Sequence, residues 1–226
     1  MRWKLLAGVP DEDVRRVLEI ARRRRFKRGE VVFHEGDPAD SLHLVVTGRF
    51  AVQRTTRLGE EALLDVVGPG DTFGEIALVS AGERSATVYA LEPAETMCVR
   101  RQEFDRLRGA HPSVDRMLVT LLAGELRRMD RLVTEAYYVS APRRVLRRLL
   151  DLAAVYGNGA AGTEIPLTQE QLASLAGASR ATVNAVLAAE RARKTIELRR
   201  GATVVRDPQA LARRAGAPPP ASDANQ

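Results

Sequence analysis

Residues 73–89, FGEIALVSAGERSATVY, contain side chains with the chemistry to hold a nucleotide. An arginine such as Arg84 offers a phosphate a planar, two-pronged donor. The turn at Gly74 can add backbone N–H groups, and Ser85 can add a hydroxyl. Glu75 would repel a phosphate, but its carboxylate can accept a hydrogen bond from a ribose hydroxyl. The stretch therefore indicates a nucleotide site, although a buried Glu75–Arg84 ion pair accounts for the same two charges equally well.

A second candidate site follows the pattern of a helix-turn-helix near the C-terminal end. Thr168 and Gln171 fit a capping box at the start of one helix, which ends at Gly177. Ser179 caps a second helix. Two short helices joined by a glycine-containing turn are typical of DNA-binding proteins. The segment IELRRGATVVRD, which turns at Gly201, predicts a hairpin wing after them.

The second of these helices carries the residues that we expect to contact DNA. Its N-terminal side chains would face base edges in the major groove. Arg180 suits guanine, a contact worth about 1–3 kcal/mol of discrimination, and Asn184 suits adenine. Ser179 and Thr182 could reach phosphates. The alternative for Arg180 is an ordinary solvent-exposed arginine.

The distribution of charge agrees with a polyanionic partner for the C-terminal part. The net charge of the chain is +6. Residues 1–138 contain 22 basic and 22 acidic residues, whereas residues 139–226 contain 13 basic and 7 acidic residues, a difference of +6. The whole excess of positive charge therefore lies in the last third, which indicates a nucleic acid or an acidic membrane surface.

The cysteine content limits the possible cofactors. Cys98 is the one cysteine among 226 residues, so a disulfide, a multi-cysteine zinc site and a cysteine-ligated iron–sulfur cluster within one chain are excluded. We expect a buried structural thiol. His34, His43 and His111 have no recognisable haem-ligand context, and we expect neither haem nor a metal. No apolar run reaches the roughly 18 residues of a membrane span, and we expect a cytoplasmic protein with no membrane partner.

The elements that must position these side chains fall into three segments. Residues 11–24 are expected to be helical, and residues 25–105 show short apolar runs between glycine-rich turns, which is typical of a β-sandwich or barrel. Residues 112–138 change to a helical period. A second copy of the same helix is the simplest partner for its apolar stripe, and packing against the β-segment is the alternative. The stripe consists of Leu118, Leu121, Leu122, Leu126, Met129, Leu132, Val133, Ala136 and Tyr137.

The two motifs GEIAL…RSAT and LTQEQLASLAGASRATV, in this order and at this spacing, resemble the cyclic-AMP receptor protein/FNR superfamily of bacterial transcription regulators. The resemblance implies an α+β fold with a β jelly-roll sensor domain (residues 1–111), a long dimerisation helix with a hinge (112–140) and a winged helix-turn-helix domain (141–214). Residues 215–226 are expected to form a disordered tail. By resemblance, the residues that line the cyclic-nucleotide site are Gly74, Glu75, Ile76, Ala77, Arg84 and Ser85.

Three departures from the family pattern bear on function. Met129 and Asp130 stand where cyclic-AMP-responsive members place small polar residues over the purine. Asp130 could accept from the adenine amine or from guanine N1–H and N2–H₂; an ion pair with Arg127 or a solvent-facing charge is the alternative. In the recognition helix, Ala181 and Ala185 replace an acidic residue and a second arginine.

The third departure lies at the end of the recognition helix. Glu190 continues its apolar stripe, where a buried unpaired carboxylate would be costly. We expect Glu190 to turn outward or to pair with Arg193 or Arg147. The helix exit, where the family typically has Gly followed by Leu, reads Lys194-Thr195.

The leading hypothesis is a homodimeric, non-enzymatic transcription regulator controlled by a cyclic nucleotide, with cAMP favoured over cGMP. Double-stranded DNA is the expected partner, and the resemblance adds RNA polymerase. One alternative is a regulator that binds DNA without ligand and keeps only a remnant of the nucleotide site. Another is a cyclic-nucleotide-binding dimer with weakened DNA binding. A cyclic-nucleotide module allied to an enzyme is disfavoured, because no residues remain for a catalytic domain.

Overall fold

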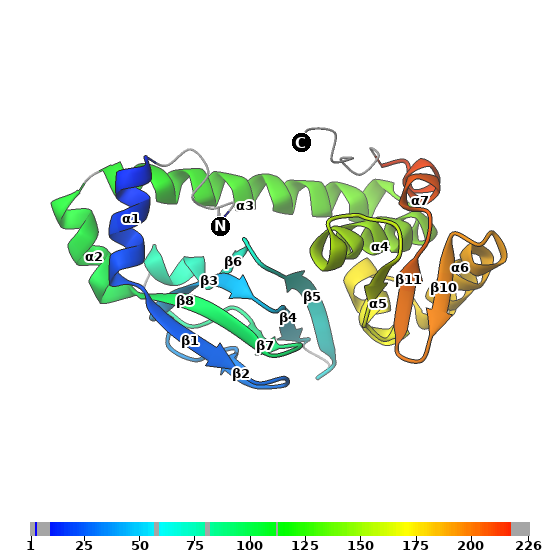
Figure 1. The fold of residues 1–226 in the computed structure, drawn as a ribbon, viewed down its shortest axis with the longest axis horizontal. Coiled ribbons are helices and arrows are strands. Elements are labelled where there is room, and N and C mark those ends of the chain that lie inside the picture. Colours follow the sequence, from blue (N-terminus) through cyan, green and yellow to red (C-terminus); the bar gives the residue numbers. More distant parts are fainter. Residues whose placement is uncertain (1–2, 4–9, 57–58, 80–81, 112, 218–226) are drawn as a thin grey trace. The chain divides into compact units, whose positions relative to one another are not determined.

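The computed structural model describes residues 3, 10–56, 59–79, 82–111 and 113–217. The chain forms two compact units, Met1–Asp130 and Arg131–Gln226. The division falls inside the long helix α3 (Ser113–Tyr138), which therefore contributes residues to both units. Figure 1 shows the elements of each unit in chain order from blue to red.

The first unit contains two four-stranded antiparallel sheets, whose strand orders are β1-β8-β3-β6 and β2-β7-β4-β5 (Figure 1). Its helices are α1 (Asp11–Ile20), α2 (Arg101–Ala110) and the short 3₁₀ helix η2 (Glu75–Leu78). Its strands are β1 (Arg22–Phe26), β2 (Val31–Phe33), β3 (Ser41–Thr47), β4 (Phe50–Thr55), β5 (Glu61–Val67), β6 (Thr72–Phe73), β7 (Thr87–Ala90) and β8 (Ala94–Arg100).

Residues from both sheets share one apolar core. Phe26 and Phe73 come from the first sheet and Phe50 and Val88 from the second, and all four belong to one buried cluster. The Phe26 and Phe50 rings meet edge to face with centroids 5.5 Å apart, a favoured aromatic geometry. This packing gives the sandwich predicted from the short apolar runs.

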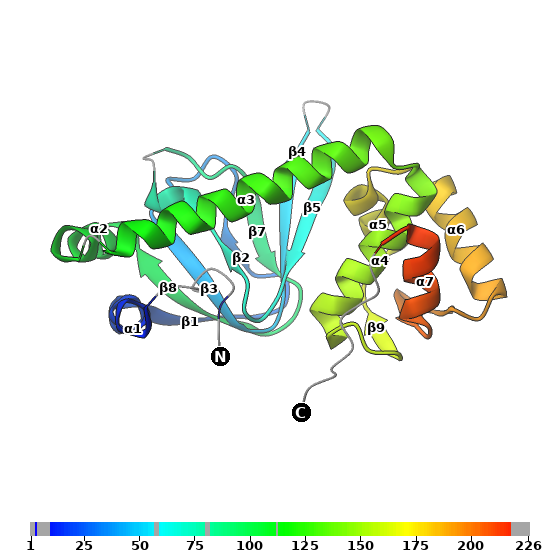
Figure 2. The ribbon, with the colours of Figure 1, turned by 90° about the horizontal axis from the view of Figure 1, so that it is seen from above.

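A second core joins the first sheet to the helices of this unit. Leu42 and Val99 of the sheet pack with Phe104 of α2 and Leu118 of α3. Arg128 of α3 also reaches β5, where its Nη2 lies 2.6 Å from Oδ2 of Asp65. The part of α3 up to Asp130 therefore lies along the first unit, as Figure 2 shows from above.

The predicted helix over residues 11–24 is wrong in its last part. Helix α1 ends at Ile20, and β1 starts two residues later. The arginines of β1 pair in register with β8, with Arg25 opposite Glu95. Arg23 and Arg25 both form ion pairs with Glu95, at 2.9 and 3.1 Å. These cross-strand contacts favour a strand over the helix that residue spacing alone predicts.

The second unit surrounds α4 (Ala141–Gly157) with three shorter helices and a small antiparallel sheet of order β10-β11-β9 (Figure 1). The other helices are α5 (Gln169–Ala176), α6 (Arg180–Ala192) and α7 (Pro208–Ala215). The strands are β9 (Thr163–Ile165), β10 (Ile196–Arg199) and β11 (Ala202–Val205). Ala215, which we assigned to the tail, is the last residue of α7, and residues 218–226 lie outside the described residues.

The predicted local signals of the helix-turn-helix are confirmed. Thr168 and Gln171 form the capping box, with both reciprocal bonds present. Gly177 adopts the left-handed conformation at φ 54°, which ends α5. The Ser179 hydroxyl accepts a hydrogen bond from the backbone N–H of Thr182 at 3.1 Å and starts α6. The two helices then meet at 108°, within the range of helix-turn-helix motifs.

The apolar side chains of the helices bear on two questions, membrane spanning and the predicted stripe of α3. No single described helix is long and apolar enough to cross a membrane, and only the bent pair α5 and α6 passes that test jointly. Leu118 of α3 is buried, whereas five other large side chains of the predicted stripe are exposed. These are Leu122, Leu126, Met129, Val133 and Tyr137.

Candidate functional site

The predicted phosphate-binding turn begins at a glycine that the fold requires. Gly74 has φ 80° and precedes η2, so its backbone is in the left-handed region that favours glycine. A Cβ at this position would lie 2.8 Å from Nη1 of Arg84 and 2.8 Å from the Ser41 carbonyl oxygen. Any side chain at position 74 would therefore displace the arginine. The turn and Arg84 form one packed unit.

The Arg84 side chain is fixed by the first residues of β3. Its Nη1 donates to the Ser41 carbonyl at 2.7 Å, and its Nη2 donates to Asp40 at 3.1 Å and to the Ser41 hydroxyl at 2.9 Å. The guanidinium carbon lies 3.9 Å from the centre of the Phe33 ring, a cation–π contact. Burial lowers the pKa of Arg84 below its ordinary value, and Asp40 opposes this shift. Arginine nevertheless stays charged.

One donor of this guanidinium remains without a partner. An arginine has five N–H donors, and the two Nη atoms make the bonds given above together with a long one to the Gly74 carbonyl at 3.5 Å. The buried Nε has no hydrogen-bond partner. A buried donor without a partner is costly, and the Nε–H of Arg84 is such a donor.

The alternative of a Glu75–Arg84 ion pair is wrong. Within the described part of the chain, Arg84 forms its ion pair with Asp40. Glu75 accepts from its own backbone N–H; burial raises the pKa of its carboxyl, and the charge of Arg84, which forms no ion pair with it, lowers that pKa. Of the charges on α3, Glu125 raises that pKa and Arg128 lowers it. The two residues therefore do not form an ion pair with each other.

The sequence did not reveal that Asp40 and Ser41 hold Arg84. They lie 44 and 43 residues before it, and the register of β3 brings them together. The signal available was an acid and a hydroxyl directly after the turn EGDPAD, at the start of an apolar strand.

The remaining predicted site residues of the first unit lie on η2, beside Arg84 and on α3. Ile76 and Ala77 belong to η2, and Ile76 is 46% exposed. Ser85 is exposed beside the buried Arg84. Asp130 is also exposed, and it forms no ion pair with Arg127 or any other described residue. Of the alternatives for Asp130, the partner of Arg127 is therefore wrong and the solvent-facing charge is observed.

A buried histidine, His43, packs against Phe73, the residue directly before Gly74. His43 of β3 stacks on Phe73, with centroids 5.0 Å apart and rings 3° from parallel. Its Nδ1 lies 3.0 Å from the Thr96 hydroxyl. Burial, with the positive charges of Arg24 and Arg84, lowers the pKa of His43 to about 3. His43 is therefore neutral at physiological pH. The Cys98 thiol next to it in register is buried, as predicted.

The predicted DNA-contacting side chains lie on the outer face of α6. Arg180 and Asn184 are one turn apart and exposed, whereas Val183 and Leu187 of the same helix are buried. Nη1 of Arg180 lies 3.9 Å from Glu170, a long and exposed contact. The Thr182 hydroxyl is within 2.9 Å of the Ser179 hydroxyl, so these two share a bond at the helix start.

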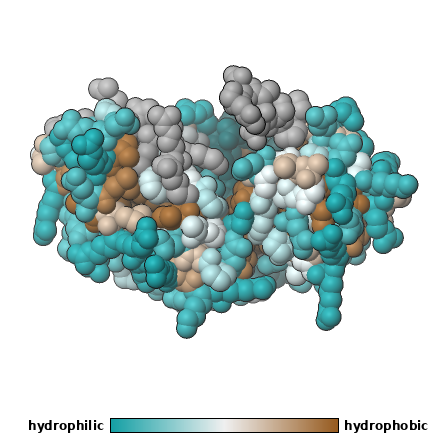
Figure 3. Space-filling view, viewed as in Figure 1, coloured by the Kyte–Doolittle hydropathy of each residue, from teal (hydrophilic) through white to brown (hydrophobic). Residues whose placement is uncertain are grey.

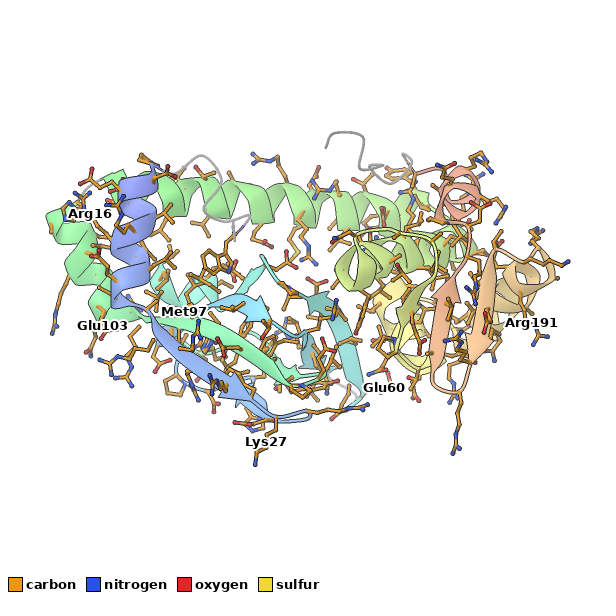
Figure 4. The ribbon with its side chains drawn as sticks, in the orientation of Figure 1. Arg16, Lys27, Glu60, Met97, Glu103 and Arg191 are labelled. Atoms are coloured by element: carbon orange, nitrogen blue, oxygen red, sulfur yellow. The ribbon has the colours of Figure 1, made fainter. Side chains whose placement is uncertain are left out.

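Exposed polar side chains continue beyond this face. Arg191, labelled in Figure 4, is exposed near the C-terminal end of α6. The face seen in Figure 3 shows hydrophilic side chains over the part of the chain that carries α6 and β10.

Glu190, at the inner face of α6, is buried and paired. Its carboxylate accepts from Arg214 of α7, with Nε–Oε1 at 2.9 Å and a second contact from Nη2. Arg193 lies 3.4 Å away, and the Thr195 hydroxyl donates at 2.6 Å. The prediction of an Arg193 contact is confirmed; an outward Glu190 and a pair with Arg147 are wrong. Arg214 was missed because the sequence does not show where α7 packs.

The unusual helix exit belongs to the same cluster. Lys194 adopts φ 61°, the left-handed conformation that glycine would take more easily. This conformation turns the chain so that Thr195 is buried against Glu190. A polar threonine at this position is therefore explained by the buried carboxylate that it contacts.

The described residues offer no alternative metal chemistry. Across them, no group of three or more His, Cys, Asp and Glu side chains is arranged to hold a metal ion.

Comparison with known proteins identifies two family domains in the chain. Residues 23–111 match the family model of the cyclic nucleotide-binding domain, and residues 143–214 match that of the Crp-like helix-turn-helix domain. The chain is 34% identical over 193 residues to the CRP-like cAMP-activated global transcriptional regulator of Mycobacterium tuberculosis, covering 84% of this chain and 86% of that protein.

A curated protein and a crystal structure from Thermus thermophilus are also similar. The chain is 34% identical over 203 residues to its cyclic AMP receptor protein, covering 90% of this chain and 92% of that one. The crystal structure of its catabolite activator protein matches with a TM-score of 0.54 and 33% identity, covering 94% of this chain and 98% of that one. The predicted α+β fold, with a jelly-roll-like domain and a C-terminal helix-turn-helix, is confirmed. The chain belongs to the cyclic-AMP receptor protein/FNR superfamily of cyclic-nucleotide-binding transcription regulators.

Proposed function

We propose that the protein is a homodimeric transcription regulator whose DNA binding is controlled by cAMP. The observation that carries the proposal is the buried, unpartnered Nε–H of Arg84 beside the Gly74 turn. This donor is satisfied if a cyclic phosphate binds there. The exposed Ser85 hydroxyl adds a second donor from the adjacent residue. Arg84 and Ser85 are therefore the proposed phosphate contacts, and Gly74 leaves the room that they need.

Glu75 is the proposed contact for the ribose 2′-hydroxyl. Its half-buried carboxylate lacks a side-chain donor among the described residues, and burial raises its pKa. A hydroxyl donor from the ligand would offset part of this desolvation cost. Ile76 and Ala77, which follow in η2, would lie against the sugar and base.

The base would be read by Asp130. Its exposed carboxylate can accept from the exocyclic amine of adenine. Guanine offers N1–H and N2–H₂ to the same group, so cGMP is the competing ligand. We propose cAMP because the similar regulators of M. tuberculosis and T. thermophilus are named for it.

The proposed dimer forms through α3. The exposed side chains Leu122, Leu126, Met129, Val133 and Tyr137 are spaced by four, three, four and four residues. This spacing follows one face of a helix, as in the seam of a coiled coil. Two copies of the helix would bury these side chains against each other.

The proposed DNA contacts are Arg180 and Asn184 to base edges and Ser179 and Thr182 to phosphates. Each subunit has a charge of +6, located in the C-terminal part, so binding should weaken steeply with salt. Such a regulator acts on DNA in the cytoplasm and meets RNA polymerase at its promoters. It is not an enzyme.

A ligand-independent regulator is the second candidate. The bonds from Arg84 to Asp40 and Ser41 favour it, because they already satisfy most of the guanidinium without a nucleotide. Weakened DNA binding is the third candidate, since Ala181 and Ala185 offer no hydrogen bonds to bases.

Calorimetric titration with cAMP and cGMP separates the first two candidates. The proposal predicts that cAMP binds with a micromolar dissociation constant and that Arg84→Ala abolishes binding. If neither nucleotide binds below millimolar concentration, the protein is a ligand-independent regulator.

A further inference from the structure

The first helical turns of α4 carry three arginines that face the end of α3. Arg144, Arg147 and Arg148 are spaced by three and one, which places them on one side of the helix. All three are partly buried. In a family of DNA-binding proteins, basic residues on a helix of the C-terminal domain suggest contacts with phosphates. The contacts of these three are instead made within the protein.

Arg144 joins the end of α3 to the turn of the helix-turn-helix. Its Nη1 donates to the carbonyl of Val139, just after α3, at 2.8 Å. Its Nε and Nη2 donate to the carbonyls of Ala176 and Gly177, at 2.9 and 2.7 Å. These two carbonyls close α5, directly before the recognition helix α6. A positive group at the C-terminal end of a helix is favourable to its dipole.

Arg147 repeats this arrangement on α7. Its Nη1 donates to Oε1 of Glu135, in the last turn of α3, at 2.9 Å. Its Nε and Nη2 donate to the carbonyls of Ala215 and Gly216 at the end of α7, at 3.1 and 3.0 Å. Arg148 binds the other oxygen of Glu135 at 2.5 Å. Two arginines of α4 thus each connect the end of α3 to the C-terminal carbonyls of another helix.

Helix α7 in turn holds the far end of α6. Arg214 makes two contacts with the buried Glu190, one residue from the α7 end that Arg147 holds. The recognition helix is therefore held at its N-terminal side through α5 and at its C-terminal side through α7. Both routes lead back through α4 to residues 135–139. In Figures 1 and 2, α4 lies beside α5 and α7, consistent with their direct contacts.

We infer that Arg144 and Arg147 are positioning residues for DNA recognition, which fix α6 to the last turn of α3 so that these elements move as one body. The inference rests on the proposed role of α6 in DNA binding. It assigns the arginines to orientation and not to phosphate contact. In a dimer, fixing α6 to α3 sets the spacing of the two recognition helices, which specific binding requires. Any rotation of this body would then have to occur in the part of α3 before Glu135.

The test compares two charge-matched double variants of the full-length protein. Arg144→Gln/Arg147→Gln removes both links. Arg143→Gln/Arg213→Gln removes two exposed arginines, one on α4 and one on α7, that make no such link. A DNA site is first selected from a random library with the wild-type protein. Affinity for this site and for unrelated DNA is then measured over a series of salt concentrations, at a temperature where circular dichroism shows each variant folded.

The inference predicts that the first variant loses at least tenfold in the ratio of specific to non-specific affinity relative to the second. Its salt dependence should match that of the second, because neither arginine contacts a phosphate. Arg147→Lys keeps the positive charge but not the three hydrogen bonds to Glu135, Ala215 and Gly216, so it should give an intermediate ratio of specific to non-specific affinity. If the first double variant does not fold, Arg147→Lys takes its place in the test.

Equal ratios for the two double variants would overturn the inference and leave the proposed function intact. So would a salt dependence that falls only in the first variant, which would make Arg144 and Arg147 phosphate contacts. If the wild-type protein selects no DNA sequence, the proposed function itself is overturned, and the inference with it.

Discussion

Nη2 of Arg84 lies 3.1 Å from Oδ1 of Asp40, so the arginine proposed to hold the phosphate already neutralises a carboxylate of the protein. The Arg84 side chain is 4% exposed and the Asp40 side chain 73% exposed. A bound phosphate and Asp40 would therefore share one guanidinium. Two anions on one cation repel each other.

Asp40→Asn should tighten the binding of cAMP. The asparagine keeps an oxygen acceptor for Arg84 but removes the competing charge, and a gain of about 0.5–1 kcal/mol corresponds to an affinity about two- to fivefold higher. Isothermal titration calorimetry measures this change.

Asp37→Asn is the matched control for Asp40→Asn. Asp37 lies on the same turn, where its carboxylate accepts from the backbone N–H of His34; it forms no ion pair with Arg84 and raises the Arg84 pKa less than Asp40 does. Its replacement should leave the affinity within twofold of wild type. Weaker binding in Asp40→Asn would mean that Asp40 orients Arg84 for the ligand and does not compete with it.

Glu75→Gln should stabilise the empty protein while weakening cAMP binding. Burial raises the pKa of Glu75, so the ionised carboxylate destabilises the fold at neutral pH. The cost is fully present above the folded-state pKa and disappears as pH falls below the unfolded value of 4.5. The gain in Tm should therefore be seen at pH 7 and vanish near pH 4. A lower Tm at pH 7 would show that the carboxylate is needed for folding.

Because of His43, the free energy of unfolding should fall in mild acid. The folded-state pKa is about 3 and the ordinary value is 6.5, so the unfolded chain binds a proton that the fold excludes. The contribution is fully present above pH 6.5 and is lost as pH falls toward 3, at up to about 1.4 kcal/mol per pH unit. Urea unfolding between pH 7 and 5 measures this slope.

Two histidine variants isolate the contribution of His43. His43→Leu should flatten the slope, whatever its stability at pH 7. His34→Gln, at an exposed position, should leave the slope as in wild type. An unchanged slope in His43→Leu would assign the acid sensitivity to other groups.

Removing one partner of the Glu190–Arg214 pair should lower the free energy of unfolding far more than replacing both partners with apolar side chains. Glu190 is 3% exposed, so Glu190→Ala leaves a partly buried arginine without its partner, at a cost of about 3–5 kcal/mol. Glu190→Leu/Arg214→Met replaces both charges with apolar groups and should recover most of that stability. Arg191→Ala, on the exposed side of α6, should change stability by less than about 0.5 kcal/mol. A loss of stability in Glu190→Leu/Arg214→Met as large as that in Glu190→Ala would contradict this account.

The local features of both sites could be predicted from the sequence because they depend on neighbouring residues. The capping box of Thr168, the ends at Gly177 and Ser179 and the wing turn at Gly201 all follow short-range rules, and the structure has each of them. The glycine at position 74 was likewise expected to form a turn.

The contacts that hold Arg84 and Glu190 could not be predicted in the same way. Asp40 meets Arg84 through the register of β3, and Arg214 meets Glu190 through the packing of α7. Both contacts depend on where distant elements pack, which periodicity does not specify. The strand at Arg22–Phe26 was missed for the same reason, since its arginines are paired by Glu95 of β8.

The central claim is that a cyclic nucleotide bound at Arg84 controls DNA binding, and the affinity for a selected DNA site with and without saturating cAMP tests it most directly. The account predicts at least tenfold tighter binding with cAMP in the wild-type protein and no response in Arg84→Ala, whose ligand-free affinity should equal that of wild type. The same DNA affinity with and without cAMP in the wild-type protein would contradict it.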